Sequence, residues 1–287
     1  MDVADLLTTE ASSARIEAIA RVALSQCYPR NHCPSYFSAL ETALVDEPPP
    51  FGTQAYADLY RNASSDGRWV AVSLMTNAER EGDGAKRLWS LSACSPNREQ
   101  QQLLKVHAVD ESRHALTYLA LLDLAFPGVT EPSFRLELQQ LSPHYSMRME
   151  LFAVEGSPYA KPPTIDDFLQ MNIAEIRTTI HHLMQRHALA EHAPIGSQSQ
   201  IRRILDALLQ DELSHVAYTA VLIEQLAQTV AGLDVAALFR RRFRDFNQIT
   251  NEELGDHAFD CSVACCAKRP HCRAKAIPVI GFIDTPI

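Results

Sequence analysis

Two short segments of this chain share one pattern, Asp-Glu-x-x-His, at residues 110–114 and 211–215. In each segment the glutamate and the histidine are three residues apart. On an α-helix this spacing places both side chains on one face, one turn apart. A carboxylate and an imidazole placed in this way can bind one metal ion together. The pattern therefore predicts that both segments lie on helices and that each contributes two metal ligands.

The repetition makes the pattern informative. A single Glu-x-x-His means little in a chain of 287 residues with 11 histidines. The Asp-Glu pair is rarer: it occurs at residues 46–47, 110–111 and 211–212, and the last two are followed by histidine at the metal-ligand spacing. The alternative is two solvated helix faces that carry these residues by chance. Because both segments lie among apolar residues, a buried metal site is the better interpretation.

The rest of the chain is expected to be helical. Only 10 glycines and long segments rich in alanine and leucine indicate an all-α fold. Apolar periodicity predicts four long bundle helices at about residues 67–93, 98–126, 165–190 and 198–228. Shorter helices are expected at about residues 12–26, 35–45, 53–62, 134–141 and 233–250. The proline-containing region 129–163 would be the long crossover between two helix pairs, and residues 239–246 would form a basic, exposed stretch.

Two of the long helices each offer one further carboxylate. On the helix at 67–93, Glu81 shares a face with the apolar residues Ala78 and Ala85, whereas Glu79 lies about 200° away from Glu81 around the helix. On the helix at 165–190, Glu175 is the only acid in the central turns, and its face continues through Thr179 and His182. The candidate metal ligands are therefore Glu81, Glu111, His114, Glu175, Glu212 and His215.

Composition excludes several classes of protein. The net charge is -9 and no basic patch stands out, which argues against nucleic acid as a partner. No run of 18 apolar residues exists and the N-terminal segment lacks a signal-peptide hydrophobic region, so we expect a cytoplasmic protein that does not span a membrane. Seven cysteines cannot all pair, so reduced thiols are expected. A structural metal in the tail is the alternative for Cys261, Cys265, Cys266, Cys272, His257 and His271.

The order and approximate spacing of the six candidate ligands resemble those of ferritin-like di-iron oxygenases. The motif is most similar to the hydroxylase subunits of bacterial multicomponent monooxygenases, which also use Asp-Glu-x-x-His twice. The resemblance implies a ferritin-like four-helix bundle over about residues 67–228, with additional N- and C-terminal helices, in a single domain of residues 1–287. It also implies that Asp110 and Asp211 each hydrogen-bond a ligand histidine, and that Thr179 lines the oxygen pocket.

The aryl-amine N-oxygenases with two irons fit the length of the chain better. Enzymes of that family carry a further ligand, a histidine one turn before one Glu-x-x-His. The second motif here has Leu208 at that position, but His107 precedes Glu111 by four residues in the first motif. His107 would be a seventh metal ligand or a nearby base, and a core histidine is the alternative. A ligating His107 would favour amine N-oxygenation, and a non-ligating one C–H hydroxylation.

These resemblances imply an enzyme with two iron ions, or a manganese and an iron ion, that activates O2 to oxidise a small organic molecule in biosynthesis. Its partners would be the substrate, a reductase or ferredoxin as electron donor, and a second copy in a homodimer. The alternative is a radical-generating or non-catalytic iron protein. The small subunit of class I ribonucleotide reductase carries its radical tyrosine four residues after the corresponding histidine, where Tyr118 stands, and ferritin stores iron.

Overall fold

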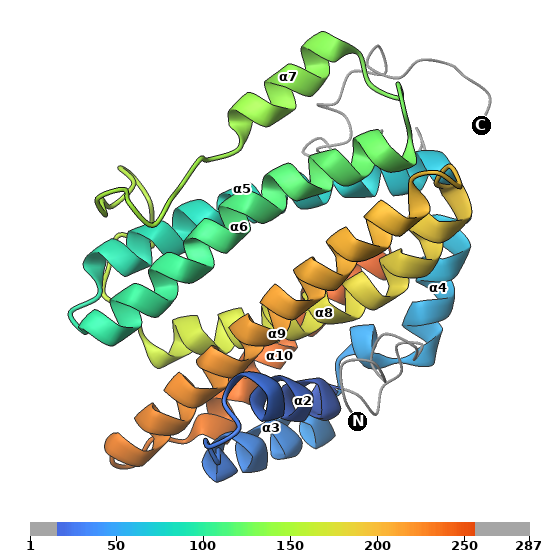
Figure 1. Ribbon diagram of the computed structural model, residues 1–287. Helices are drawn as coiled ribbons and strands as arrows, with labels where there is room; N and C mark the ends of the chain where they lie inside the picture. The colour runs from blue at the N-terminus through green and yellow to red at the C-terminus, as the bar shows by residue number, and fades with distance from the viewer. Residues whose placement is uncertain (1–15, 256–287) are drawn as a thin grey trace. The chain divides into compact units, whose positions relative to one another are not determined.

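The computed structural model describes residues 16–255, and the regular structure among them is entirely helical, without a β-strand (Figure 1). This confirms the predicted all-α class. The helices are α2 (Ile16–Cys27), α3 (Pro34–Asp46), α4 (Gln54–Ser64), α5 (Gly67–Cys94), α6 (Arg98–Ala125), α7 (Pro132–Leu141), α8 (Ile165–His192), α9 (Gln198–Thr229) and α10 (Val235–Gly255). Each predicted helix has a counterpart, although the predicted start of the first one, at residue 12, lies outside the described residues.

The described chain divides into two compact units. One unit comprises residues 16–63, 164–187 and 205–255, and the other comprises residues 64–163 and 188–204. The first unit contains the Asp-Glu-x-x-His segment of α9, and the second contains that of α6. Each unit therefore has its own helix pair with one copy of the motif, and the two are described separately below.

In the second unit, α5 and α6 run side by side and are joined by a short turn (Figure 1). Both helices begin at a side-chain cap: Asp66 accepts a hydrogen bond from the Arg68 amide at 2.9 Å, and Asn97 accepts one from the Gln100 amide at 3.0 Å. Such caps satisfy amides that have no partner inside the helix. The Asn97 cap fixes where α6, the helix of the first motif, begins.

The crossover after α7 is bound to this helix pair by side chains of α5 and α6. The Ser112 hydroxyl donates to the Pro143 carbonyl at 2.6 Å and accepts from the Tyr145 amide at 3.0 Å. The Tyr145 ring stacks on the buried Trp89, with 4.3 Å between ring centroids. Gly82 lets the chain approach closely, because a Cβ atom there would lie only 3.2 Å from Pro143 Cδ. These contacts order the crossover along the helices that carry the motif.

In the first unit, one buried amide links three helices. Asn172 of α8 donates to the Val216 carbonyl of α9 at 3.1 Å and to the Thr219 hydroxyl at 3.0 Å. Its oxygen accepts a hydrogen bond from the hydroxyl of Tyr36 on α3 at 2.9 Å. The amide of Tyr36 in turn donates to the buried carboxylate of Glu224 at 2.7 Å. Because buried polar groups are costly unless they are satisfied, this network fixes the register of α8 against α9.

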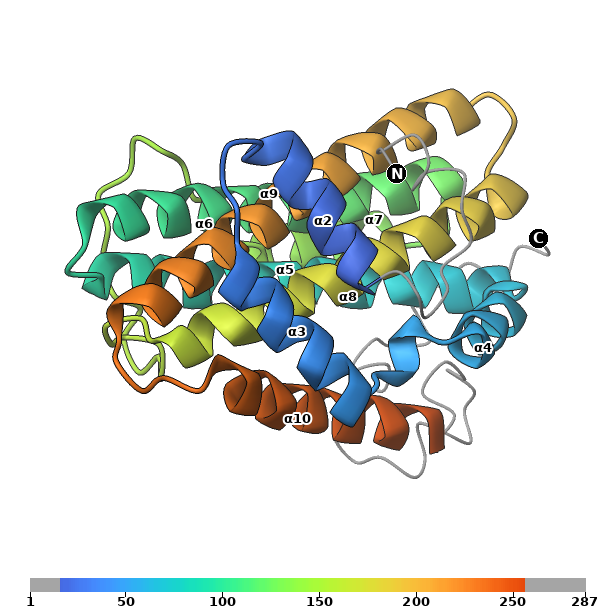
Figure 2. The ribbon, with the colours of Figure 1, turned by 90° about the horizontal axis from the view of Figure 1, so that it is seen from below.

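Helix α10 corrects one expectation from the sequence. Residues 239–246 were predicted to form an exposed basic stretch, but Phe239 and Phe243 are completely buried, four residues apart on one face. The arginines of this stretch are exposed or half-buried, and two of them pair with acids: Arg240 with Asp46 at 3.0 Å, and Arg244 with Glu47 at 2.6 Å. Helix α3 accordingly lies beside α10 (Figure 2).

Two further expectations concern membranes and thiols. In the part of the chain that the structure describes, no helix is both long and apolar enough to cross a membrane. Within the same residues, Cys27, Cys33 and Cys94 are free thiols. The cysteine- and histidine-containing tail, with its alternative interpretation as a metal site, lies outside the described residues.

The ion pairs of Asp166 generate a test of how α8 is held against α10. Asp166, in the first turn of α8, accepts hydrogen bonds from Arg241 at 2.8 Å and from Arg242 at 3.0 Å. Burial alone would raise the pKa of this carboxyl, but the hydrogen bonds from the two arginines hold its pKa below the usual range. The ionised form is therefore the one that stabilises the fold.

We expect Asp166→Asn to lower the free energy of unfolding by about 1 kcal/mol near neutral pH, as for a partly exposed ion pair. A group with a depressed folded pKa stabilises fully above its unfolded pKa of about 4, so the difference should shrink below that pH and vanish once the pH is below the lowered pKa of the folded protein. Urea unfolding at several pH values measures this. Asp58→Asn, which removes an exposed pair with Arg61, is the control and should cost less. If Asp166→Asn still had the lower free energy of unfolding at low pH, the ionised form of Asp166 would not be the source of the stabilisation.

Candidate metal centre

The α5–α6 cluster, formed by Glu81, Glu111 and His114, belongs to the second unit. Each of its residues offers one ligand atom, and these atoms all lie within 4.8 Å of one another. Glu111 and His114 are buried on α6, and Glu81 is half-buried on α5. The His114 Nδ1 atom lies 3.6 Å from Glu111 Oε1. Two carboxylates and an imidazole from neighbouring helices therefore point to one small region.

The register of α5 is the one that the sequence predicts. Ala78 and Ala85 are buried, Glu81 is half-buried between them, and Glu79 is exposed. Gly84 also borders the cluster, because a Cβ atom there would lie 3.7 Å from Glu111 Oε2, with no other heavy atom within 4 Å. The α5 face next to Glu111 is thus lined by small residues, and Gly84 lies where a side chain would come into van der Waals contact with this carboxylate.

His107 points toward the same carboxylate. Its Nε2 atom lies 3.2 Å from Glu111 Oε1, the oxygen that His114 also approaches, and its side chain is only 1% exposed. The spacing of four residues on α6 accounts for this contact. The histidine predicted as a seventh ligand is therefore next to the α5–α6 cluster, at a distance that suits either a shared metal ion or a hydrogen bond.

Electrostatics favour the ionised form of Glu111. Burial by itself would raise the pKa of this carboxyl, but the neighbouring Glu81, His107 and His114 side chains outweigh it and hold the pKa well below the usual range. A carboxylate must be deprotonated to bind a metal ion. Glu111 is thus prepared for metal binding by its neighbours.

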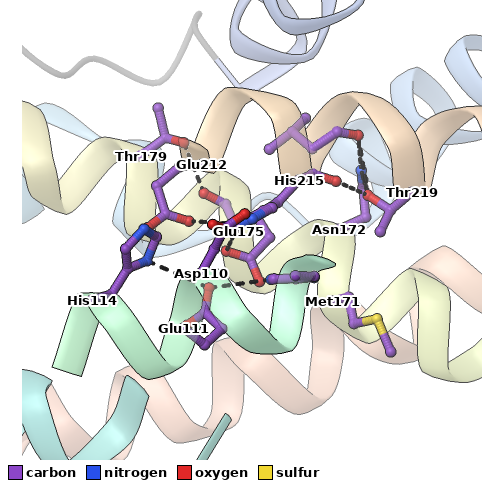
Figure 3. A network of polar contacts seen from close by, with 12 residues as sticks. Asp110, Glu111, His114, Met171, Asn172, Glu175, Thr179, Glu212, His215 and Thr219 are labelled. Carbon is purple, nitrogen blue, oxygen red and sulfur yellow. Dashed lines mark hydrogen bonds and ion pairs between the residues drawn. The ribbon is translucent and has the colours of Figure 1, made fainter. Parts of the chain in front are cut away.

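The α8–α9 cluster, formed by Glu175, Glu212 and His215, belongs to the first unit and is shown in Figure 3. His215 Nδ1 lies 3.5 Å from Glu212 Oε2 and 4.0 Å from Glu175 Oε2. The three side chains are between 1% and 12% exposed. This cluster repeats the composition of the other: one glutamate from the first helix of a pair, and Glu-x-x-His from the second.

His182 is a site residue to which the sequence assigned no role. Its Nε2 atom lies 3.4 Å from Glu212 Oε1, and both side chains are 1% exposed. The signal was present in the sequence, because His182 follows Glu175 by seven residues, which is two helical turns along the same face of α8. Spacing within one helix could not show that its partner would be a carboxylate on α9.

The aspartates beside the two motif glutamates are less buried than the glutamates themselves. Asp110 accepts a hydrogen bond from Arg113 at 2.7 Å, and its side chain is 21% exposed. Asp211 is half-buried on α9. The hydrogen bonds to ligand histidines that the resemblance implies for these two aspartates stay a prediction.

Two further candidates lie one turn from a cluster residue. Thr179 is fully buried, and its hydroxyl donates to the Glu175 carbonyl of its own helix at 2.8 Å. Lining of an oxygen pocket by Thr179 stays a prediction. Tyr118 is 2% exposed on α6, one turn after His114.

The chemistry of the donors fits a divalent transition metal. Carboxylate oxygens and imidazole nitrogens suit iron, manganese and zinc, and the glutamate-plus-Glu-x-x-His set on paired helices is the one that two-metal carboxylate bundles use. Isolated buried carboxylates would be costly, whereas a bound cation would offset their charge. The described residues therefore contain buried groups of histidine and glutamate that can hold a metal ion.

No protein-family model, curated protein or solved structure matches this chain.

Proposed function

We propose that the two clusters together hold two iron ions and that the protein uses O2 to oxidise a small organic molecule. One observation carries the proposal: each helix pair supplies a glutamate from its first helix and a buried Glu-x-x-His from its second. This is the ligand arrangement of di-iron carboxylate proteins, in which the two pairs face each other. Manganese in place of one iron would use the same donors.

Charge balance supports two divalent ions. The four glutamates of the two clusters carry four negative charges when ionised, and two Fe(II) ions carry four positive charges. The imidazoles add donors without adding charge. A neutral assembly of this kind is compatible with the burial of the carboxylates, whereas a single ion would leave excess negative charge in a region of low dielectric.

The overall reaction needs a reductant as well as O2. Hydroxylation converts R–H, O2, two electrons and two protons into R–OH and water, and N-oxygenation converts an amine into a hydroxylamine with the same balance. The bound irons would supply electrons to O2, and a reductase or ferredoxin would replace them. The protein would orient the substrate and exclude water, with Ala78 and Ala85 keeping the α5 face small and apolar.

His107 favours N-oxygenation over C–H hydroxylation. The amine N-oxygenases carry a histidine one turn before one Glu-x-x-His, and here a histidine stands at that spacing before the other motif: His107 Nε2 lies 3.2 Å from Glu111 Oε1. A neutral nitrogen donor there would occupy a coordination position without changing the charge of the site. The substrate class under this proposal is therefore a small amine.

Tyr118 supports a second candidate function. Its ring is buried one turn after His114, the position of the radical tyrosine in the small subunit of ribonucleotide reductase. A radical-generating protein would show a persistent tyrosyl radical signal after exposure to O2. An oxygenase would instead consume O2 in proportion to product. The homodimer and the cytoplasmic location stay predictions.

The first prediction from this proposal concerns metal content. The purified, iron-loaded protein should contain two iron ions per chain, and Glu111→Gln and Glu212→Gln should each lower that number because each removes a charged ligand. Elemental analysis measures it. Glu224→Gln is a matched control, since Glu224 is also a buried acid of α9 but caps α3. It should reduce stability and keep two irons, and full loading of both cluster variants would contradict the proposal.

The second prediction compares two acids of α5. Glu81→Gln should lower the rate of iron-dependent O2 consumption at least about 100-fold, because loss of a ligand should cost no less than loss of a group that supports one. Glu79→Gln should leave the rate close to that of the unaltered protein, since Glu79 is exposed. An oxygen electrode with the reduced, iron-loaded protein measures both. The reverse order of effects would show that Glu81 is not a ligand.

A further inference from the structure

The two oxygens of Glu212 face two different histidines. His215 Nδ1 lies 3.5 Å from Oε2, and His182 Nε2 lies 3.4 Å from Oε1. His215 is part of the Glu-x-x-His motif, so Oε2 is the oxygen on the side of the expected metal ion. His182 comes from α8 and approaches the other oxygen of the same carboxylate.

Glu111 has different surroundings in the α5–α6 cluster. His107 and His114 both approach its Oε1, at 3.2 and 3.6 Å. Its Oε2 lies beside Gly84, where a Cβ atom would still be 3.7 Å away. Glu111 thus has both histidines on one oxygen, whereas Glu212 has a histidine at each oxygen.

The additional histidine of each cluster comes from a different helix of its pair. His182 lies seven residues after the lone glutamate of α8, and the corresponding position of α5 is the buried Leu88. His107 lies four residues before the motif glutamate of α6, and the corresponding position of α9 is the buried Leu208. The α5–α6 pair therefore has the leucine on its first helix and the histidine on its second, whereas the α8–α9 pair has the histidine on its first helix and the leucine on its second.

The contact between His182 and Glu212 has one favourable arrangement of protons. An ionised carboxylate only accepts hydrogen bonds, so Nε2 of His182 must carry the proton that lies between them. Both side chains are 1% exposed, so bulk water does not compete for Oε1. A donor held in this way restricts rotation of the carboxylate about its terminal bond.

We propose that His182 is a positioning residue that holds Oε1 of Glu212 and so reserves Oε2 for the metal ion bound with His215. This inference rests on the proposed metal site. Under it, Glu212 binds through one oxygen in a fixed orientation. The two motifs, identical in sequence pattern, then differ in how their glutamates are held.

Cobalt(II) binding tests this without recourse to activity, because the visible spectrum of bound cobalt reports its coordination. The unaltered protein is compared with His182→Leu, which removes the donor, and with His182→Gln, whose amide N–H can still donate to Oε1. His187→Gln is the matched control, since His187 is exposed on the same helix. Circular dichroism establishes that each variant is folded.

We expect the unaltered protein and His187→Gln to bind two cobalt ions with the same spectrum. His182→Leu should still bind two, but one about 10–100-fold more weakly and with an altered spectrum, as for loss of a group that orients a ligand. His182→Gln should recover most of the affinity and the spectrum. If His182→Leu does not fold, recovery in His182→Gln remains the deciding measurement.

Three results would overturn the inference. Unchanged affinity and spectrum in both folded His182 variants would make His182 a packing residue. Loss of one cobalt ion from His182→Gln, with two retained by the unaltered protein, would make it a metal ligand rather than a positioning residue. Failure of the unaltered protein to bind cobalt would reject the proposed metal site itself, and the inference with it.

Discussion

Burial of carboxylates among apolar helices is the constraint on which the rest of this account depends. Glu111 and Glu212 are at most a few per cent exposed, and each lies near imidazoles of its own unit. Taking such groups out of water is costly unless partners or a cation offset their charge. The helix pairs α5–α6 and α8–α9 each supply those partners at fixed helical positions, and this makes each pair a candidate metal-binding element.

The two helix pairs repeat a motif but not its surroundings. Glu111 meets two histidines of its own helix and a glycine on α5, whereas Glu212 meets one histidine of its own helix and one from α8. A repeated motif supplies the ligands, and the neighbouring side chains decide how freely each carboxylate can move. In the proposed oxygenase, His182 would hold Glu212 in one orientation.

Helix positions and register were predictable from the sequence because they depend on local periodicity and caps. The choice of Glu81 over Glu79 agrees with the exposure of Glu79, since two residues on a helix point to different sides. Contacts between elements distant in sequence were not predictable. The pairing of α10 arginines with α3 acids required knowing which helices are neighbours, and the contact of His182 with Glu212 required the relative register of α8 and α9.

The central claim is that the two clusters form one centre with two adjacent irons. Mössbauer spectroscopy in an applied field, on protein loaded with ⁵⁷Fe and exposed to O2, tests it most directly. Two ferric ions bridged in one centre should be strongly coupled and give a diamagnetic ground state. Spectra of two independent, magnetically uncoupled high-spin ferric ions would show that each helix pair binds its own metal and would contradict the account.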